Sequence, residues 1–296
     1  DITNCQQLQA IQNDTDGAYT LAQDIDCAGT NQWNSNGDGG FEGFEPISNF
    51  SGTLDGNNYT ISGLYINRPG SCGQGIFDTL QSGSVIQDLA INNLSLTASC
   101  DSAPLAAFAD GGSTITNVST SGSVAVSYGA GGIIGIAESE DEGDITVSDS
   151  ASNVTFAASN EDNQQTVGGI VGYVNSYRST VSLLNNQVTM NVSNSSANAY
   201  RIGGMTGGAD LYDDGHLVID GSEVDGAITA HSTLAGLVGE VDSSWSTMDD
   251  RPSLTITNSQ VVMNMLGKGA VGGLVSYIEA SGLDVRIENS SYLGYS

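Results

Sequence analysis

The sequence predicts an all-β fold, a right-handed parallel β-helix, from a repeated glycine-apolar motif and a near absence of helix-forming stretches. The motif is a small residue followed by an apolar pair. The small residue stands at positions 75, 106, 132, 169, 204, 236 and 273, which gives spacings of 31, 26, 37, 35, 32 and 37 residues. A near-fixed period of this size is the mark of a repeat protein. The right hand is expected because β crossovers are overwhelmingly right-handed.

Two further apolar-alternating runs follow the motif in each unit, as at 145–147 and 154–156. Short strands of this kind cannot bury their apolar faces alone and must stack on neighbouring units. We therefore predict three short strands per coil and about seven coils. An Asn or Asp that ends the middle run, such as Asn117, Asp149 or Asn258, suits a turn because it tolerates a left-handed φ.

The chain is expected to divide into residues 1–66, an N-terminal cap with the first coils, and 67–296, the repeat β-helix, in one continuous body. Thr3 and Gln6 resemble a capping box ahead of a short helix, which would cover the open end of the solenoid. The last residues show no comparable cap. Because an uncovered coil exposes strand edges, we expect the natural protein to continue into further domains, with a fold-back of the last residues over the coil as the alternative.

Charge excludes two classes of partner. Six basic residues stand against 34 acidic ones, for a formal net charge of −28. Nucleic acid and anionic membrane surfaces both need a cationic face, so neither is an expected partner. Membrane insertion is not expected either, because no apolar run approaches the roughly 20 residues that span a bilayer. The acidity fits a marine or saline exterior, with ordinary surface acidity as the alternative.

The four cysteines predict two disulfides. Cys5 and Cys27 bracket the first unit, while Cys72 and Cys100 lie just ahead of two successive motifs. Stacked coils lie about 4.8 Å apart, which is within disulfide reach. We predict the pairs Cys5–Cys27 and Cys72–Cys100, and hence an oxidising compartment and a secreted or cell-surface protein. Free buried thiols are the alternative.

The motifs also resemble a known family. The runs at 44–47, 50–61 and 63–66, together with the later Gly-Gly-Leu-Val-Gly runs, are similar to those of the GLUG-repeat proteins, and the resemblance covers nearly the whole chain. It implies a secreted or surface-exposed bacterial protein, since the repeat occurs in adhesins and in non-catalytic parts of surface proteases. The units with Ala106-Ala107-Phe108 and Thr206 depart from the pattern. These motifs specify the scaffold and carry no chemistry.

One loop, residues 34–45, matches the spacing of a calcium-binding loop. Oxygen ligands fall at positions 1, 3, 5, 9 and 12, and Gly39 provides the sharp turn at position 6. The first ligand departs from the pattern because Asn replaces Asp. A polar, glycine-rich loop that matches by chance is the alternative. The expected Ca²⁺ ligands are Asn34, Asn36, Asp38, Glu42 and Glu45.

A single stretch brings carboxylates, a tyrosine and a histidine together. Paired carboxylates can share the acid and base roles of glycoside hydrolysis, and histidine can act as a general base. If the chain is an enzyme, its catalytic residues are expected here. A surface turn is the alternative. The residues are Asp210, Asp213, Asp214 and His216.

Three functions remain open, because parallel β-solenoids host many. The resemblance implies an adhesin-like module that binds glycans or another cell-surface component. The alternatives are a polysaccharide-degrading enzyme and a passive spacer of a larger surface protein. The scarcity of basic residues argues against a uronate lyase unless calcium supplies the charge. Exposed aromatics would favour glycan binding, and the candidates are Trp33, Trp245, Tyr173, Tyr177, Tyr212 and Tyr277.

Overall fold

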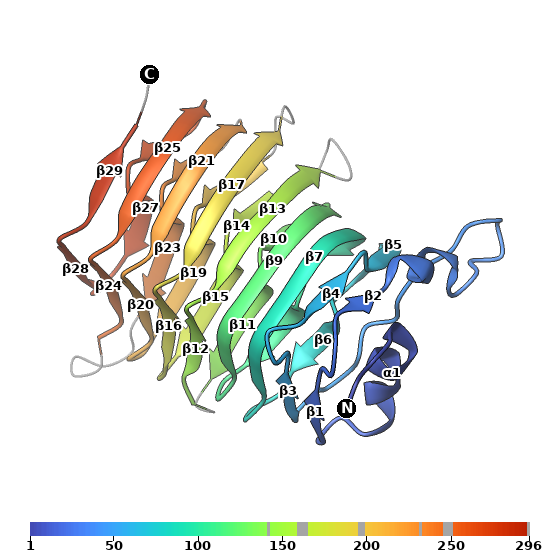
Figure 1. The fold of residues 1–296 in the computed structure, drawn as a ribbon. Helices are drawn as coiled ribbons and strands as arrows, with labels where there is room; N and C mark the ends of the chain where they lie inside the picture. Colours follow the sequence, from blue (N-terminus) through green and yellow to red (C-terminus); the bar gives the residue numbers. More distant parts are fainter. Residues whose placement is uncertain (141–142, 159–164, 195–198, 231–232, 245–250, 295–296) are drawn as a thin grey trace.

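The chain, described here from a computed structural model, is a parallel β-solenoid of about seven turns with one short N-terminal helix, which confirms the predicted fold class (Figure 1). Figure 1 shows the coils stacked in chain order, from the blue end that carries α1 to the red end formed by β28 and β29. The structure describes residues 1–140, 143–158, 165–194, 199–230, 233–244 and 251–294.

The N-terminal cap begins with the predicted helix, although its capping box is displaced by one residue. Asn4, rather than Thr3, is the N-cap, and its side-chain oxygen accepts from the Gln7 N–H at 2.9 Å. Gln7 in turn accepts from the Thr3 N–H at 2.7 Å. Asn is as good an N-cap as Ser or Thr, so the sequence pattern alone did not separate the two positions. The cap elements are α1 (Cys5–Gln9), η1 (Ala10–Asn13), β1 (Ala18–Thr20), β2 (Ile25–Asp26) and η2 (Ala28–Gln32).

Three parallel sheets form the faces of the solenoid. The large, 17-stranded sheet contains β1 and β2 with β3 (Thr53–Asp55), β4 (Thr60–Ser62), β5 (Tyr65–Cys72), β7 (Val85–Cys100), β9 (Thr114–Val126), β12 (Ile145–Ser148), β13 (Ala151–Ala158), β16 (Thr180–Leu184), β17 (Gln187–Asn194), β20 (His216–Asp220), β21 (Glu223–Ala230), β24 (Ser253–Thr257), β25 (Gln260–Gly267), β28 (Asp284–Glu288) and β29 (Ser291–Leu293).

The glycine motifs lie between the other two sheets. The five-stranded sheet contains β10 (Gly129–Gly131), β14 (Gln165–Gly168), β18 (Ala199–Gly203), β22 (Thr233–Ala235) and β26 (Val271–Gly272). The seven-stranded sheet contains β6 (Phe77–Leu80), β8 (Ala106–Asp110), β11 (Ile134–Glu140), β15 (Val171–Tyr177), β19 (Thr206–Tyr212), β23 (Val238–Ser244) and β27 (Val275–Ala280). The prediction gave three strands per coil. From the third glycine motif onward, the residues just before the motif form a fourth, short strand.

The turn between the two runs of the large sheet is made as predicted. A single residue with φ between 50° and 63° separates those runs in each coil. Asn and Asp tolerate this left-handed conformation better than other side-chain-bearing residues. The residues concerned are Asn117, Asp149, Asn185, Gly221, Asn258 and Asn289.

The core consists of apolar columns in which each coil covers the next. One column of direct register partners contains Ile115, Val147, Leu183, Ile219, Ile256 and Ile287. The first five are fully buried, and each contributes about 1.5–3 kcal/mol through burial. In the last coil the same inward position is uncovered, so that Ile287 is 45% exposed.

Both predicted disulfides are present, and all four cysteines are paired. Cys5–Cys27 joins the cap helix to the residue after β2, with 5.5 Å between the Cα atoms. Cys72–Cys100 joins register partners on β5 and β7, with 4.5 Å between the Cα atoms. Disulfides persist in oxidising compartments. None of the helices in the described part of the chain is long and apolar enough to cross a membrane.

Candidate functional site

A hollow of about 320 Å³ opens where the five-stranded and seven-stranded sheets meet. We call it the tyrosine hollow. Two consecutive strands of the seven-stranded sheet, β11 and β15, form one wall, and β14, β18 and the residues that precede β10 form the other. Its lining side chains are Asp101, Tyr128, Ile136, Thr166, Tyr173 and Arg201.

Two tyrosines give the hollow its aromatic surface. The Tyr128 side chain is 50% exposed. The Tyr173 ring is partly buried because it packs over Gly208, its register partner on β19. A Cβ atom on Gly208 would lie 2.6 Å from Tyr173 Cε2 and 3.4 Å from Arg201 Cδ. The absence of a side chain at this one position therefore allows the ring and the arginine stem to lie against the strand.

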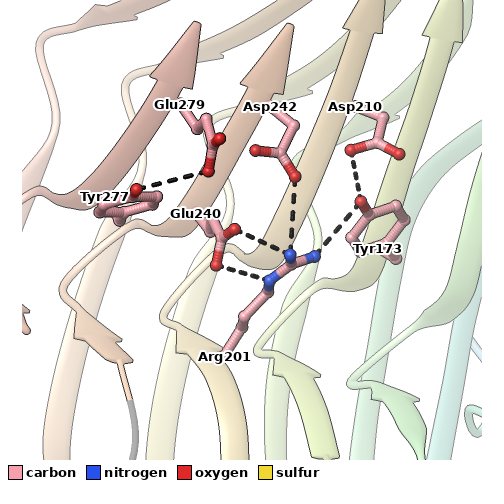
Figure 2. Close-up of polar contacts among 7 residues, drawn as sticks. All are labelled: Tyr173, Arg201, Asp210, Glu240, Asp242, Tyr277 and Glu279. Carbon is pink, nitrogen blue, oxygen red and sulfur yellow. Dashed lines mark hydrogen bonds and ion pairs between the residues drawn. The ribbon is translucent and has the colours of Figure 1, made fainter. Parts of the chain in front are cut away.

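Arg201 lines the tyrosine hollow, and its guanidinium lies among Tyr173, Glu240 and Asp242 (Figure 2). Its Nε and Nη2 donate to the two Glu240 carboxylate oxygens at 2.6 and 2.8 Å, and Nη2 also lies 3.5 Å from Asp242. A bidentate arginine–carboxylate pair of this kind fixes both side chains and is stronger than a neutral hydrogen bond. The guanidinium is thus already engaged by the protein's own carboxylates.

The tyrosine hydroxyls near Asp210 keep their protons at neutral pH. Tyr173 Oη donates to Asp210 Oδ1 at 2.5 Å, and burial followed by this contact raises the pKa of Tyr173 above its usual range. Burial and Asp210 also raise the pKa of Tyr212 to about 12. Both groups therefore act as hydrogen-bond donors, and neither is poised to act as a general base.

Carboxylates form a column along the outer surface of the seven-stranded sheet. Direct register partners in this column are Asp110, Glu138, Asn175, Asp210, Asp242 and Glu279. Adjacent strands are 4.7–4.9 Å apart, and like charges directly opposite one another destabilise a sheet. Burial and then the neighbouring Glu240 raise the pKa of Asp242. A carboxyl whose pKa is raised by folding lowers stability at neutral pH, and stability recovers as the pH falls towards that pKa.

We expect Asp242→Asn to raise the melting temperature at pH 7 and low salt. The substitution removes one charge from between Asp210 and Glu279, for a gain of about 0.2–1 kcal/mol. Arg201 keeps its bidentate contact with Glu240. The gain should shrink in about 1 M salt, where screening is strong, and as the pH falls through the raised pKa of the native carboxyl, where that group loses its charge. Thermal unfolding of both proteins checks this, and an unchanged or lower melting temperature at pH 7 would contradict it.

Asp101 contributes a carboxylate to the hollow. It is partly buried, and burial raises its pKa, while its own backbone N–H lowers it. No other described residue makes a hydrogen bond or ion pair with it. Its Oδ1 lies over Gly129, where an added Cβ would be 2.3 Å away. The hollow thus presents an unneutralised carboxylate to whatever occupies it.

The structure divides the predicted catalytic residues into two groups. Asp210 lies on β19 and is bonded to Tyr173. Asp213 and Asp214 form the following turn with φ of 34° and 59°, and Asp214 Oδ1 lies 3.0 Å from His216 Nε2. His216 Nδ1 also lies 2.8 Å from Ser253 Oγ on the neighbouring coil, its register partner. Sequence reasoning missed Ser253, because only the register of coils 37 residues apart brings it to the histidine.

The predicted calcium loop is held by contacts within the protein. Asn34 Nδ2 donates to Gly43 O at 2.7 Å, and Asn36 Oδ1 accepts from the N–H groups of Asp38 and Gly40 at 3.0 Å. Glu42 forms an ion pair of 2.7 Å with Arg68. The Glu45 backbone N–H donates to Gln9 Oε1 at 2.9 Å, and its carbonyl oxygen accepts from Gln9 Nε2 at 2.8 Å. Within the described residues, no group of three or more His, Cys, Asp or Glu side chains is placed to hold a metal ion.

The predicted aromatic candidates are scattered. Tyr173 lies in the tyrosine hollow, whereas Trp33 packs against the core. Tyr177 receives the Arg178 guanidinium at 4.8 Å from its ring centroid, and Tyr277 is 45% exposed on β27. Trp245 lies outside the described residues. The prediction did not include Tyr128, the most exposed tyrosine of the hollow, because an isolated tyrosine between two strands carries no sequence signal of its own.

Comparisons with known proteins support the fold. No family model matches the chain, so the resemblance to GLUG-repeat proteins rests on the motifs alone. Halomucin of Haloquadratum walsbyi is 39% identical over 143 residues, which are 46% of this chain and 2% of halomucin. An immunoglobulin A1 protease of Streptococcus sanguinis is 23% identical over 273 residues, which are 90% of this chain and 13% of the protease. The chain therefore spans only a small part of either relative.

Two solved structures share the architecture. An IgA1 protease matches with a TM-score of 0.69 and 19% identity, covering 99% of this chain and 21% of the protease chain. A Bacteroides ovatus structure named for immunoglobulin A1 protease matches with a TM-score of 0.54 and 20% identity, covering 94% and 83% of the two chains. At such identities the likeness shows the fold. This chain is thus a β-solenoid similar to those of IgA1 proteases.

Proposed function

We propose that the chain is a β-helix module of a larger extracellular or cell-surface protein, and that it binds an uncharged glycan in the tyrosine hollow. The observation that carries the proposal is the half-exposed Tyr128 beside Tyr173 in a hollow of about 320 Å³. This volume lies at the lower end of the range typical of ligand sites. Tyrosine offers an apolar ring face together with a polar hydroxyl, which suits the C–H faces and hydroxyls of a sugar.

The charges around the hollow favour an uncharged ligand. Arg201 is engaged by Glu240, while Asp101 has no cationic partner among the described residues. The whole chain carries a net charge of −28. A uronate or sulfated polymer would therefore be repelled and would find no free guanidinium to neutralise it. An uncharged sugar hydroxyl can still donate to Asp101 or to the Tyr173 hydroxyl oxygen, and it can accept from Thr166.

The extracellular setting is supported by two disulfides and by the relatives. Cys5–Cys27 and Cys72–Cys100 require an oxidising compartment to persist. The relatives of which this chain matches a small part are named halomucin and immunoglobulin A1 protease.

A catalytic role on the same scaffold is the second candidate, favoured by the contact series Asp214–His216–Ser253. An aspartate, a histidine and a serine joined in this order can activate the serine hydroxyl. Two observations weigh against it. These three residues line neither the tyrosine hollow nor the hollow of about 350 Å³ beside the Cys72–Cys100 disulfide. The Ser253 N–H donates to Gly215 O within the chain, so it is not available to stabilise an oxyanion.

A polysaccharide panel tests both candidates. We expect neutral polymers such as β-glucan, mannan and chitin to retain the purified protein, and alginate and polygalacturonate not to retain it. Retention should survive about 0.5 M salt, because it depends on stacking and hydrogen bonds rather than on charge. Reducing ends are followed in the same tubes. Retention by the anionic polymers alone would overturn the proposal, and new reducing ends would favour the catalytic candidate.

The calcium site remains a proposal with a test of its own. If Ca²⁺ binds the loop at 34–45, it must replace the protein contacts of Asn36 and Glu42. Ca²⁺ that binds only the folded state increases the free energy of unfolding, and the melting temperature rises as a consequence. We expect a rise of about 2–6 °C in 10 mM CaCl₂ relative to EDTA, and no rise in a variant with Asp38→Asn and Glu42→Gln. Identical melting curves for the wild type would rule the site out.

A further inference from the structure

A second hollow of about 350 Å³ lies on the same side of the solenoid, nearer the N-terminus. We call it the polar hollow. It lies between the end of β5 and the strands β6 and β8, beside the Cys72–Cys100 disulfide. Its lining combines hydroxyl, amide and charged groups with one aromatic ring. The side chains used below are Glu45, Arg68, Gln74, Asp78, Thr79 and Phe108.

The two hollows are joined by one column of register partners. Thr79 pairs with Phe108, Phe108 with Ile136, and Ile136 with Tyr173. Thr79 and Phe108 line the polar hollow, whereas Ile136 and Tyr173 line the tyrosine hollow. Strand spacing makes the column about 14 Å long. Since Phe108 and Ile136 are direct neighbours, one hollow begins where the other ends.

The wall of the polar hollow contains polar atoms that have no partner. Gln74 is 6% exposed, and its Oε1 has no hydrogen-bond partner, although its Nε2 donates to Cys72 O at 2.7 Å. Arg68 Nε is likewise without a partner, although its Nη1 is paired with Glu42. An unsatisfied buried acceptor or donor costs stability. Both atoms are buried, so neither faces the hollow as it stands. A sugar hydroxyl can donate to Gln74 Oε1 once that side chain rotates towards the hollow, and the Arg68 side chain, which is 16% exposed, lines the same wall.

The combined groove has two ends. At the C-terminal end, Arg201 and its partner Glu240 fill the space over Gly208, and the carboxylate column continues past them with Asp242 and Glu279. At the N-terminal end, Glu45 and Pro46 form the wall of the polar hollow. A groove closed at both ends holds a limited number of sugar units. One unit of an extended glycan is about as long as one strand spacing, so the column of about 14 Å holds on the order of three units.

We propose that the polar hollow and the tyrosine hollow are consecutive subsites of one site, which binds a neutral glycan polymer lying along the solenoid axis. This inference rests on the proposed function, because it extends the tyrosine hollow to a longer ligand. It assigns Phe108 as the ring shared between the subsites. It assigns Gln74 and Arg68 as the groups that receive sugar hydroxyls in the N-terminal subsite.

Titration calorimetry with a length series tests the inference. The probes are β-1,4-linked oligomers of glucose, mannose and N-acetylglucosamine, two and six units long. For the glycan that binds, we expect the hexamer to bind at least tenfold more tightly than the dimer. Equal affinities would overturn the two-subsite inference and leave the tyrosine hollow in place as a short site. If no oligomer of either length binds, the proposed function fails and the inference fails with it.

A hexamer can also bind more tightly because it offers more copies of the same sugar unit to one short site. Matched variants distinguish this explanation from a second subsite. Thr79→Arg fills the polar hollow from an outward-facing position of β6 and should return the hexamer to the affinity of the dimer, with dimer binding unchanged. Thr189→Arg makes the same change at an outward-facing position of the large sheet, beside a hollow of about 290 Å³. It should leave both affinities unchanged. A hexamer gain that survives Thr79→Arg, or is lost in Thr189→Arg, would overturn the inference.

Discussion

Replacement of Tyr128 by alanine is expected to weaken glycan binding about tenfold and to leave the melting temperature unchanged. The ring is half exposed and lines the tyrosine hollow, so its removal takes away an aromatic surface without opening the core. Tyrosine is among the side chains that most often dominate a binding site, and a loss of about 1.4 kcal/mol corresponds to a factor of ten. Tyr128→Phe, which keeps the ring, should retain most of the affinity.

Tyr277 provides the matched control for this prediction. Its side chain is 45% exposed on the seven-stranded sheet, which forms one wall of the tyrosine hollow, but it lies on β27, beyond the Arg201–Glu240 pair that ends the groove. We expect Tyr277→Ala to change affinity less than twofold. Equal losses of affinity in the two variants would show that any exposed tyrosine contributes to binding wherever it lies. The tyrosine hollow would then not be the binding site.

Gly169→Val should lower the melting temperature by about 5–10 °C. A Cβ at residue 169 would lie 2.1 Å from the Gly204 carbonyl oxygen of the next coil and 2.5 Å from Val188 Cγ1. Because the ladder fixes the coil spacing at about 4.8 Å, neither neighbour can withdraw without breaking register. Overpacking of this kind costs about 2–3 kcal/mol.

The control for the glycine prediction is Gly70→Val. Gly70 lies in β5, is exposed, and has no atom within 4 Å of an added Cβ. This substitution should change the free energy of unfolding by less than about 0.5 kcal/mol. If thermal unfolding shows equal decreases in melting temperature for both variants, the valine side chain itself is the cause. The claim that coils approach too closely at the motif glycines to admit a side chain would then be wrong.

Most of the fold could be predicted from the repeat motif in the sequence. A period of 26–37 residues, apolar alternation and a recurrent Asn or Asp were enough to predict parallel coils, and the turn residues adopt the left-handed conformation expected of them. The disulfides could be predicted for the same reason, since Cys72 and Cys100 hold equivalent places in successive coils. The coils, the turn residues and the disulfides could be predicted because each depends on the spacing of residues within one repeat or between successive repeats. The helix cap was displaced by one residue because Thr3 and Asn4 are both good N-caps.

The groove could not be predicted in the same way. Tyr173, Arg201 and Glu240 are separated by 28 and 39 residues, and they meet only because coils of unequal length hold register. A difference of one residue on a strand would turn any of these side chains to the opposite face. The prediction singled out Asp210 and His216 for their closeness in sequence, whereas the structure joins them to Tyr173 and Ser253 of other coils.

Hydrogen–deuterium exchange with and without the glycan hexamer that binds most tightly tests the central claim most directly. If the tyrosine hollow is the binding surface, ligand should slow amide exchange in 128–137 and 166–175, where its walls lie, and leave the large-sheet strands β17 and β21 unchanged. Protection confined to the large sheet, or unchanged exchange throughout at saturating hexamer, would contradict the assignment of the binding site.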